Sequence, residues 1–171
     1  MSKEFEIKGC VSRLAANNAE FILLLCNSTY PTPFKDIHLN YLDRLQELAE
    51  GRPVGYSGHE RGFVVPIAAV ARGAKVIEKH LTLDKQDEGI DHRVSLDPIE
   101  FAAMVQGIRE IELSLGDSLS RRITQGELIN RQNLGKSVYA SRNIGEGEVL
   151  RAEDLVIRSP GHGIEPYRKA E

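Results

Sequence analysis

The sequence is poor in several residue types, and each shortage narrows what the protein can be. It has no tryptophan, and aromatic residues make up 6% of it. Its two cysteines, Cys10 and Cys26, are too few for a disulfide framework and have no metal-ligand spacing, so we expect reduced thiols. The longest apolar run without proline, residues 21–26, is far shorter than the ~20 residues of a membrane-spanning helix. The charged start of the chain also lacks the apolar core of a targeting peptide, and we therefore expect a cytoplasmic protein.

Neither sign of charge is in large excess. Lys and Arg number 22 and Asp and Glu number 25, which gives a net charge of −3. Such a balance supplies no field that attracts nucleic acid or an acidic membrane surface. A chain of 171 residues, 41% of them hydrophobic, is long enough to bury a sizeable core. The composition predicts a globular protein that binds neither nucleic acid nor membrane.

Apolar residues recur with helical spacing in some segments and form short continuous runs in others. We predict helices at residues 7–15, 42–48, 67–71 and 98–115, and strands at residues 21–26, 54–57 and 75–82. Strands that alternate with helices predict an α/β fold with a parallel sheet. Because three buried strands leave two open edges, we expect these segments to be the C-terminal part of a larger structure.

Two histidines lie at the ends of neighbouring predicted strands. His59 follows strand 54–57, and His80 lies near the end of the next strand. Side chains alternate between the two faces of a strand, so Ser57 shares a face with His59, and Glu78 shares a face with His80. A parallel sheet collects its chemistry at the carboxyl ends of its strands, and neutral imidazole is a common ligand for divalent metals. The pattern predicts a two-histidine metal site; the alternative is that each histidine caps its strand by bonding a backbone group.

The last third of the chain has a different pattern. Residues 117–133 are polar and rich in arginine, and we predict that they link a domain at 1–116 to another at 134–171. The second domain contains short strand-like segments and a glycine-rich turn. It has only about 38 residues, near the size at which isolated domains become marginally stable, so we predict an incomplete β-rich domain.

Five motifs carry a resemblance to a known family. They are, in order, CNSTYPTP (26–33), VGYSGHE (54–60), PIAAVA (66–71), GAKVIEKHLTL (73–83) and SPGHG (159–163). Together they resemble the sialic acid synthases, which condense phosphoenolpyruvate with an N-acetylated hexose such as N-acetylmannosamine and release phosphate. The resemblance implies that residues 1–116 form strands six to eight of a (β/α)8 TIM barrel. It also implies that residues 134–171 begin an antifreeze-like (SAF) domain, and that the full-length protein is a homodimer.

The resemblance assigns functions to residues of the first domain. His59 and His80 match the two histidines that hold Mn2+ or Mg2+ in the family. Ser57 matches a serine that contacts phosphoenolpyruvate. Glu78 points toward the same strand ends, and we expect it to orient a ligand histidine or a metal-bound water. We count Glu78, together with Tyr30, as a candidate catalytic residue.

Four further substrate contacts follow from the same resemblance. Ser28 matches a contact to phosphoenolpyruvate, and Tyr30 matches a contact to the sugar. Asp91 matches the acid that accepts hydrogen bonds from sugar hydroxyls. The family arginine that reaches a partner subunit's active site would fall at Ser159, and Arg158, one position earlier, is the candidate to replace it.

The sequence also departs from the family pattern. Many members have aspartate where this chain has Gly58, which removes a carboxylate that could bond the second nitrogen of His59. The first five barrel strands, which carry the lysines that bind phosphoenolpyruvate, have no match here. Two hypotheses follow. The chain is the C-terminal section of a synthase and is inactive alone, or it is a non-catalytic metal- or carbohydrate-binding fragment from a truncated gene.

Overall fold

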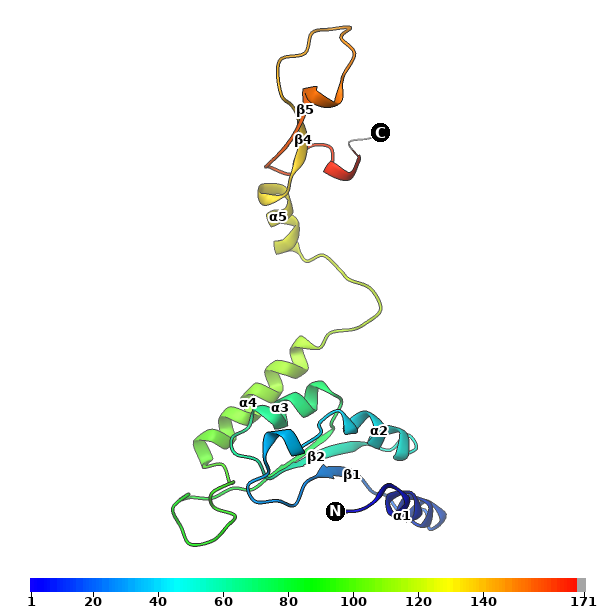
Figure 1. The fold of residues 1–171 in the computed structure, drawn as a ribbon, viewed down its shortest axis with the longest axis vertical. Coiled ribbons are helices and arrows are strands. Elements are labelled where there is room, and N and C mark those ends of the chain that lie inside the picture. The colour runs from blue at the N-terminus through cyan, green and yellow to red at the C-terminus, as the bar shows by residue number, and fades with distance from the viewer. Residues whose placement is uncertain (169–171) are drawn as a thin grey trace. The chain divides into compact units, whose positions relative to one another are not determined.

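The structure, a computed structural model, describes residues 1–168. The chain divides into two compact units, the first ending at Gly116 and the second beginning at Asp117 (Figure 1). The first unit contains α1 (Glu4–Ala16), β1 (Leu23–Cys26), α2 (Tyr41–Leu48), β2 (Val54–Gly58), α3 (Val64–Ala71), β3 (Val76–Lys79) and α4 (Pro98–Ser114). The second contains α5 (Gln125–Leu134), β4 (Ser137–Ala140) and β5 (Leu155–Arg158). The predicted helix–strand alternation is confirmed; β1 and β3 are shorter than the sequence indicated, and β2 extends one residue further, to Gly58. In the part of the chain described, no helix is long and apolar enough to cross a membrane.

The three strands of the first unit form one parallel sheet in the order β1-β2-β3. Leu23 pairs with Val54, and Gly55 pairs with Val76, so the strands run in register toward the same edge. The α/β class is therefore confirmed. Gly55 is required at the centre of the sheet, because a Cβ there would lie 2.4 Å from the carbonyl oxygen of Val76.

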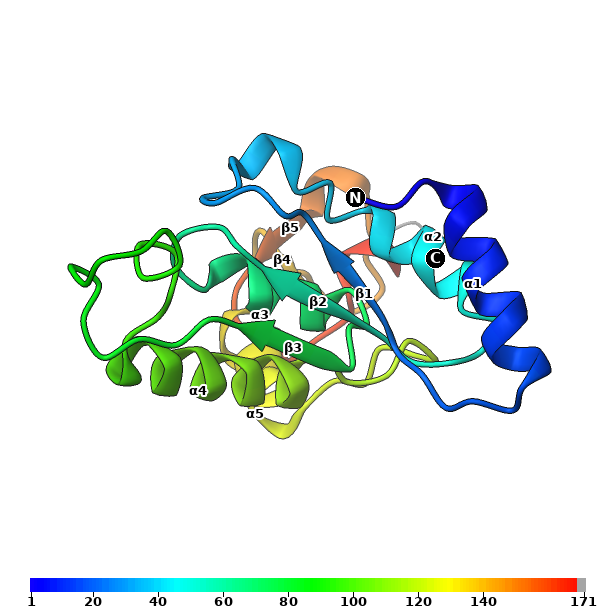
Figure 2. The ribbon, with the colours of Figure 1, turned by 90° about the horizontal axis from the view of Figure 1, so that it is seen from below.

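The core lies on one face of this sheet. Val54 and Tyr56 of β2, each 2% exposed, pack against Leu42 and Leu45 of α2 and against Ala69 of α3. Figure 2 shows α2 and α3 behind the strands. The residues that alternate with them along the strands, among them Cys26, Ser57 and Glu78, lie on the other face. The sheet thus separates its structural face from the face that carries the candidate site.

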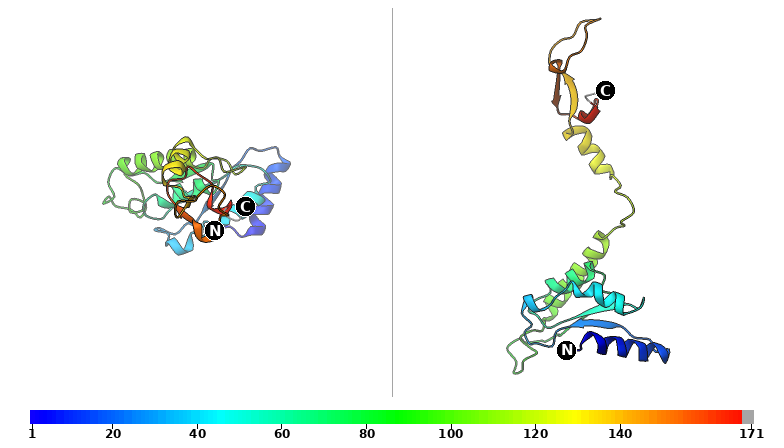
Figure 3. Two further views of the ribbon diagram at one scale, coloured as in Figure 1. Left: turned by 90° about the horizontal axis from the view of Figure 1, so that it is seen from above. Right: turned by 45° about the vertical axis from the view of Figure 1, so that its right-hand side comes forward.

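Two helix contacts complete the first unit. Helix α4 packs against α3 (Figure 3) and begins at a capping box in which Asp97 accepts a hydrogen bond from the backbone N–H of Glu100 at 2.8 Å. Helix α1 is tied to α2 by Arg44, whose guanidinium donates to Glu4 at 2.6 Å and holds the pKa of that carboxyl at about 2. The helix predicted at residues 98–115 is therefore confirmed, with Asp97 as its N-cap.

The second unit is built on an antiparallel pair of strands. Strand β4 pairs with β5, with Ser137 opposite Arg158. The Arg142 guanidinium bonds the Asp154 carboxylate at 2.6 Å and lowers its pKa. The segment predicted as a linker, residues 117–133, contains most of α5. Thr124 caps this helix and forms a capping box with Glu127. The segment is polar and rich in arginine, so a search for apolar residues at helical spacing does not detect the helix.

Removal of the α4 cap tests the helix assignment. In Asp97→Ala, the N–H of Glu100 loses its acceptor, and we expect the free energy of unfolding to fall by about 1 kcal/mol. Urea unfolding followed by circular dichroism measures the change. The matched control is Asp87→Ala in an exposed loop, which should stay within about 0.5 kcal/mol of the parent chain. Equal losses in the two variants would contradict the capping role.

The open edges of the sheet predict self-association. Within residues 1–168, β1 and β3 each pair with β2 and with no other named strand, and unpaired strand edges recruit other chains. We expect the chain expressed alone to form oligomers, measured by size-exclusion chromatography with light scattering. Leu24→Lys, on the sheet face away from the helices, should reduce association, whereas Ala103→Lys on the exposed side of α4 should not. A monomer that melts cooperatively would overturn the prediction.

Candidate functional site

The candidate site lies at the carboxyl edge of the parallel sheet, on the face away from α2 and α3. His59 follows the last residue of β2, and His80 follows the last residue of β3. Their rings meet edge to face, with centroids 5.1 Å apart. The structure thus brings together the two histidines that the alternation of side chains predicted to share a face.

His59 is held by hydrogen bonds at both ring nitrogens. Nδ1 lies 2.8 Å from the backbone carbonyl oxygen of Asn27, and Nε2 lies 3.0 Å from the hydroxyl of Tyr30. A carbonyl only accepts, so Nδ1 carries the proton, and in the neutral ring Nε2 accepts from Tyr30. This is the arrangement of a metal-binding histidine, whose second nitrogen is oriented by a backbone carbonyl. The backbone carbonyl of Asn27 therefore orients the His59 ring without a carboxylate at position 58.

Tyr30 links the two histidines. Its ring centroid lies 4.3 Å from that of His59 and 5.9 Å from that of His80. Burial, followed by the nearby carboxylate of Asp91, raises the pKa of Tyr30. The hydroxyl therefore stays protonated and remains a donor toward Nε2 of His59. Asp91 also approaches the second histidine, with its Oδ1 3.8 Å from Nδ1 of His80.

A second pair of polar side chains lies one position back along the strands. Ser57 of β2 is opposite Glu78 of β3 and donates a hydrogen bond of 2.6 Å to its Oε1. Ser57 is 4% exposed, whereas Glu78 is exposed. A buried hydroxyl thus fixes one oxygen of a carboxylate whose side chain reaches solvent on the site's face of the sheet.

Two further predicted contacts have exposed side chains. Ser28 is exposed, and its Oγ lies 3.8 Å from the sulfur of Cys26. Arg158 lies on β5 in the second unit, with an exposed side chain. The substrate roles of both residues stay predictions.

The histidine pair supplies part of the donor set that a divalent cation needs. Two imidazoles at this spacing can approach one ion, and Nε2 of His59 is the lone pair that a metal would take. Among residues 1–168, no group of three or more His, Cys, Asp or Glu side chains is arranged to hold a metal ion. The residues therefore fit a cation held by two protein ligands with open positions for substrate and water, and they do not fit a closed structural site.

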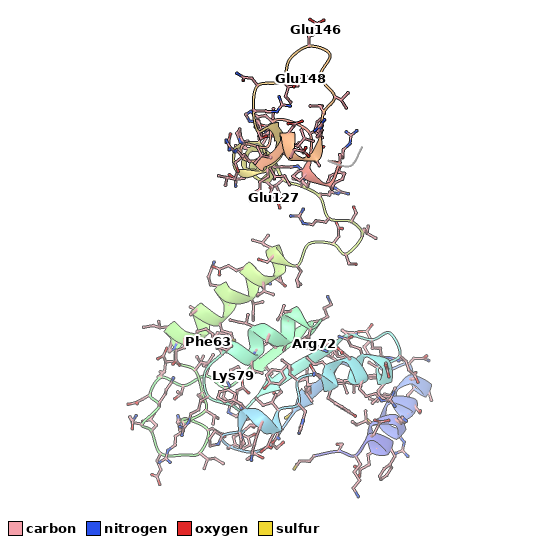
Figure 4. The ribbon with its side chains drawn as sticks, turned by 45° about the horizontal axis from the view of Figure 1, so that its top comes forward. Phe63, Arg72, Lys79, Glu127, Glu146 and Glu148 are labelled. Carbon is pink, nitrogen blue, oxygen red and sulfur yellow. The ribbon has the colours of Figure 1, made fainter. Side chains whose placement is uncertain are left out.

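A buried polar cluster behind the histidines escaped the sequence analysis. Lys79, labelled in Figure 4, is the last residue of β3 and lies on the helix-facing side of the sheet. Its ammonium group is 3.2 Å from Oε1 of Glu60, and the two side chains are 0% and 1% exposed. Burial lowers the pKa of Lys79, and Glu60 opposes that shift. The sequence did contain a signal for this cluster: a lysine next to a histidine in an apolar strand. A lysine buried in such a strand requires a partner for its charge.

The sequence matches a known family over most of its length. Residues 1–120 match the NeuB family. The chain is 42% identical over 141 residues to human N-acetylneuraminate-9-phosphate synthase, a match that covers 82% of this chain and 39% of the relative. It is 37% identical over 169 residues to the N,N'-diacetyllegionaminic acid synthase of Campylobacter jejuni, covering 97% of this chain and 50% of the relative. The chain thus spans half or less of the length of these relatives.

Solved structures agree with the sequence matches. The N-acetylneuraminic acid synthetase of Leptospira borgpetersenii, crystallised with citrate, superposes with a TM-score of 0.69 at 37% identity, over 76% of this chain and 46% of that one. A putative spore coat polysaccharide biosynthesis protein E from Chromobacterium violaceum gives a TM-score of 0.65 at 28% identity, over 92% of this chain and 47% of that one. The three parallel strands and their helices are therefore part of a TIM-barrel domain. The chain belongs to the NeuB family of sialic acid synthase-like proteins.

Proposed function

We propose that this chain forms the section of a nonulosonic acid synthase that holds the divalent metal and the sugar. The observation that carries the proposal is the grouping of His59, His80 and Tyr30 at one edge of the sheet, with ring centroids 4.3 to 5.9 Å apart, in a NeuB-family chain. In the family order, the three strands correspond to strands six to eight of the barrel. Relatives named as N-acetylneuraminate-9-phosphate and legionaminic acid synthases support this reaction class.

In the proposed reaction, C3 of phosphoenolpyruvate forms a bond to the aldehyde carbon of an N-acetylated hexose, water adds at C2, and phosphate leaves. A Mn2+ or Mg2+ ion held by His59 and His80 would supply a Lewis acid for the aldehyde oxygen. Tyr30 donates a hydrogen bond from its hydroxyl to a sugar oxygen. Asp91 accepts hydrogen bonds from sugar hydroxyls.

Ser57 and Glu78 serve the second half of this reaction. The hydroxyl of Ser57 holds Oε1 of Glu78 at 2.6 Å, which leaves Oε2 to take a proton from the water that adds at C2. Ser57 and Ser28 also lie on the strand segments where phosphoenolpyruvate is expected. Lys79 lies at this edge but on the opposite face of the sheet, bonded to Glu60, so the charges of phosphoenolpyruvate are neutralised by groups outside the set His59, His80, Tyr30, Ser57, Glu78 and Asp91.

The second unit belongs to the same proposal. Residues 134–171 begin an SAF domain, and Arg158 reaches the active site of the other subunit of a homodimer. The antiparallel pair β4–β5 supports a β-rich domain. The match to the Campylobacter jejuni synthase, which covers 97% of this chain, supports counting this unit as part of the family protein.

Metal binding by the histidine pair tests the proposal. We expect the chain to bind Mn2+, seen as loss of the free-ion signal in electron paramagnetic resonance, and we expect His59→Ala and His80→Ala each to abolish it. Each variant removes one of only two protein ligands. His162→Ala, in the second unit, is the matched control and should bind like the parent chain. Binding retained in both single variants would overturn the assignment.

Turnover by the chain alone is expected to be absent. Each charge-assisted hydrogen bond to a substrate anion contributes about 1.5–3 kcal/mol, and several are needed for the phosphate and carboxylate of phosphoenolpyruvate. With phosphoenolpyruvate, N-acetylmannosamine and Mn2+, we therefore expect no phosphate release above the rate without protein. Release in proportion to added chain, lost in His59→Ala, would contradict this expectation and show that the chain is catalytic by itself.

A further inference from the structure

Behind the candidate site, three buried polar side chains form a connected cluster. Lys79 bonds the carboxylate of Glu60 at 3.2 Å and also donates to the backbone carbonyl oxygen of Glu60. The hydroxyl of Tyr56 donates to the other carboxylate oxygen at 2.7 Å. These three residues, here called the buried clamp, lie on the face of the sheet opposite the histidine rings.

Each half of the buried clamp adjoins a candidate metal ligand. Glu60 follows His59 directly, and Lys79 directly precedes His80. The paired register of β2 and β3 ends at Gly58 and Lys79, one residue before the two histidines. The side chain of Lys79 therefore links β3 to the backbone that follows β2, at the point where the strand ladder stops.

Gly58 makes room for this link. A Cβ at position 58 would lie 2.8 and 2.9 Å from the two carboxylate oxygens of Glu60 and 2.9 Å from the ring of Tyr56. Position 58 is also the register partner of Lys79. The carboxylate of Glu60 thus fills the space that a side chain at position 58 would need. This accounts for glycine at a position where many members of the family have aspartate.

We infer that the buried clamp is a positioning device that sets the spacing between His59 and His80 for a divalent cation. The inference deepens the proposed function and rests on it. Replacing a buried ion pair by apolar side chains of similar volume is often neutral or stabilising, so a need for stability alone does not explain the pair. Residues that orient metal ligands, in contrast, typically change metal affinity about 10- to 100-fold when they are replaced.

An apolar replacement separates positioning from stability. The variant Tyr56→Phe/Glu60→Met/Lys79→Met removes every polar group of the clamp together, so no buried charge is left without a partner. We expect it to fold, with a cooperative thermal transition, but to lose the nuclear Overhauser contact between the two imidazoles in the metal-free chain. Its Mn2+ affinity should fall about 10- to 100-fold.

The matched control is Glu4→Gln/Arg44→Met. This pair joins α1 to α2 with side chains that are 37% and 41% exposed. The control should keep both the imidazole contact and the Mn2+ affinity of the parent chain. A folded apolar variant that also keeps both would overturn the positioning role and leave the clamp purely structural. If the parent chain shows the imidazole contact but binds no Mn2+, and the apolar variant loses the contact, the proposed metal site fails and the clamp's positioning role stands.

A second variant keeps the test decisive if the apolar one does not fold. Gly58→Asp/Glu60→Ala moves the carboxylate to the register partner of Lys79 and frees the space that Glu60 occupies. We expect this variant to keep the imidazole contact and most of the Mn2+ affinity, whereas Gly58→Asp alone crowds two buried carboxylates together and should fail to fold stably. A relocated carboxylate that leaves the chain folded but without the imidazole contact would contradict the inference.

Discussion

Strand β2 is buried along its whole length, and the division of its residues between two faces determines the rest of the first unit. Val54 and Tyr56 point to the helices and build the core, while Ser57 and His59 point to the other face and build the site. Because side chains alternate strictly, one fixed register serves both purposes. A shift by one residue would place the histidine in the core and the tyrosine in the site.

This constraint explains why so much of the structure could be predicted from the sequence. The parallel direction of the strands follows from their alternation with helices, and the shared face of His59 and His80 follows from a period of two and from the rule that parallel strands end at one edge. The strand ends were predicted less well, since Phe21 and Thr82 extend the apolar pattern beyond the hydrogen-bonded ladder. Helix α5 was missed because its formation depends on a cap at Thr124 rather than on an apolar stripe.

The contacts of the site were harder to predict than its location. The bond from Nδ1 of His59 to the carbonyl of Asn27 joins residues 32 positions apart, and a backbone acceptor leaves no mark in the sequence. Glu60 lies two residues beyond the end of β2, yet it is 1% exposed. Its burial depends on two other choices, glycine at 58 and lysine at 79, whose connection becomes visible only once the register of β2 and β3 is known.

The two hypotheses for the histidines, strand caps or metal ligands, turn out to be compatible for His59. Its Nδ1 caps a neighbouring strand end through the carbonyl of Asn27, and that same bond leaves the lone pair on Nε2, the other ring nitrogen. Tyr30 occupies this lone pair at 3.0 Å. Any ligand that takes Nε2 must displace the tyrosine hydroxyl, which is then released to bond another oxygen nearby. In the proposed function, a cap, a ligand atom and a donor to substrate would be successive uses of one hydrogen-bonded chain, anchored at its far end by the backbone carbonyl of Asn27.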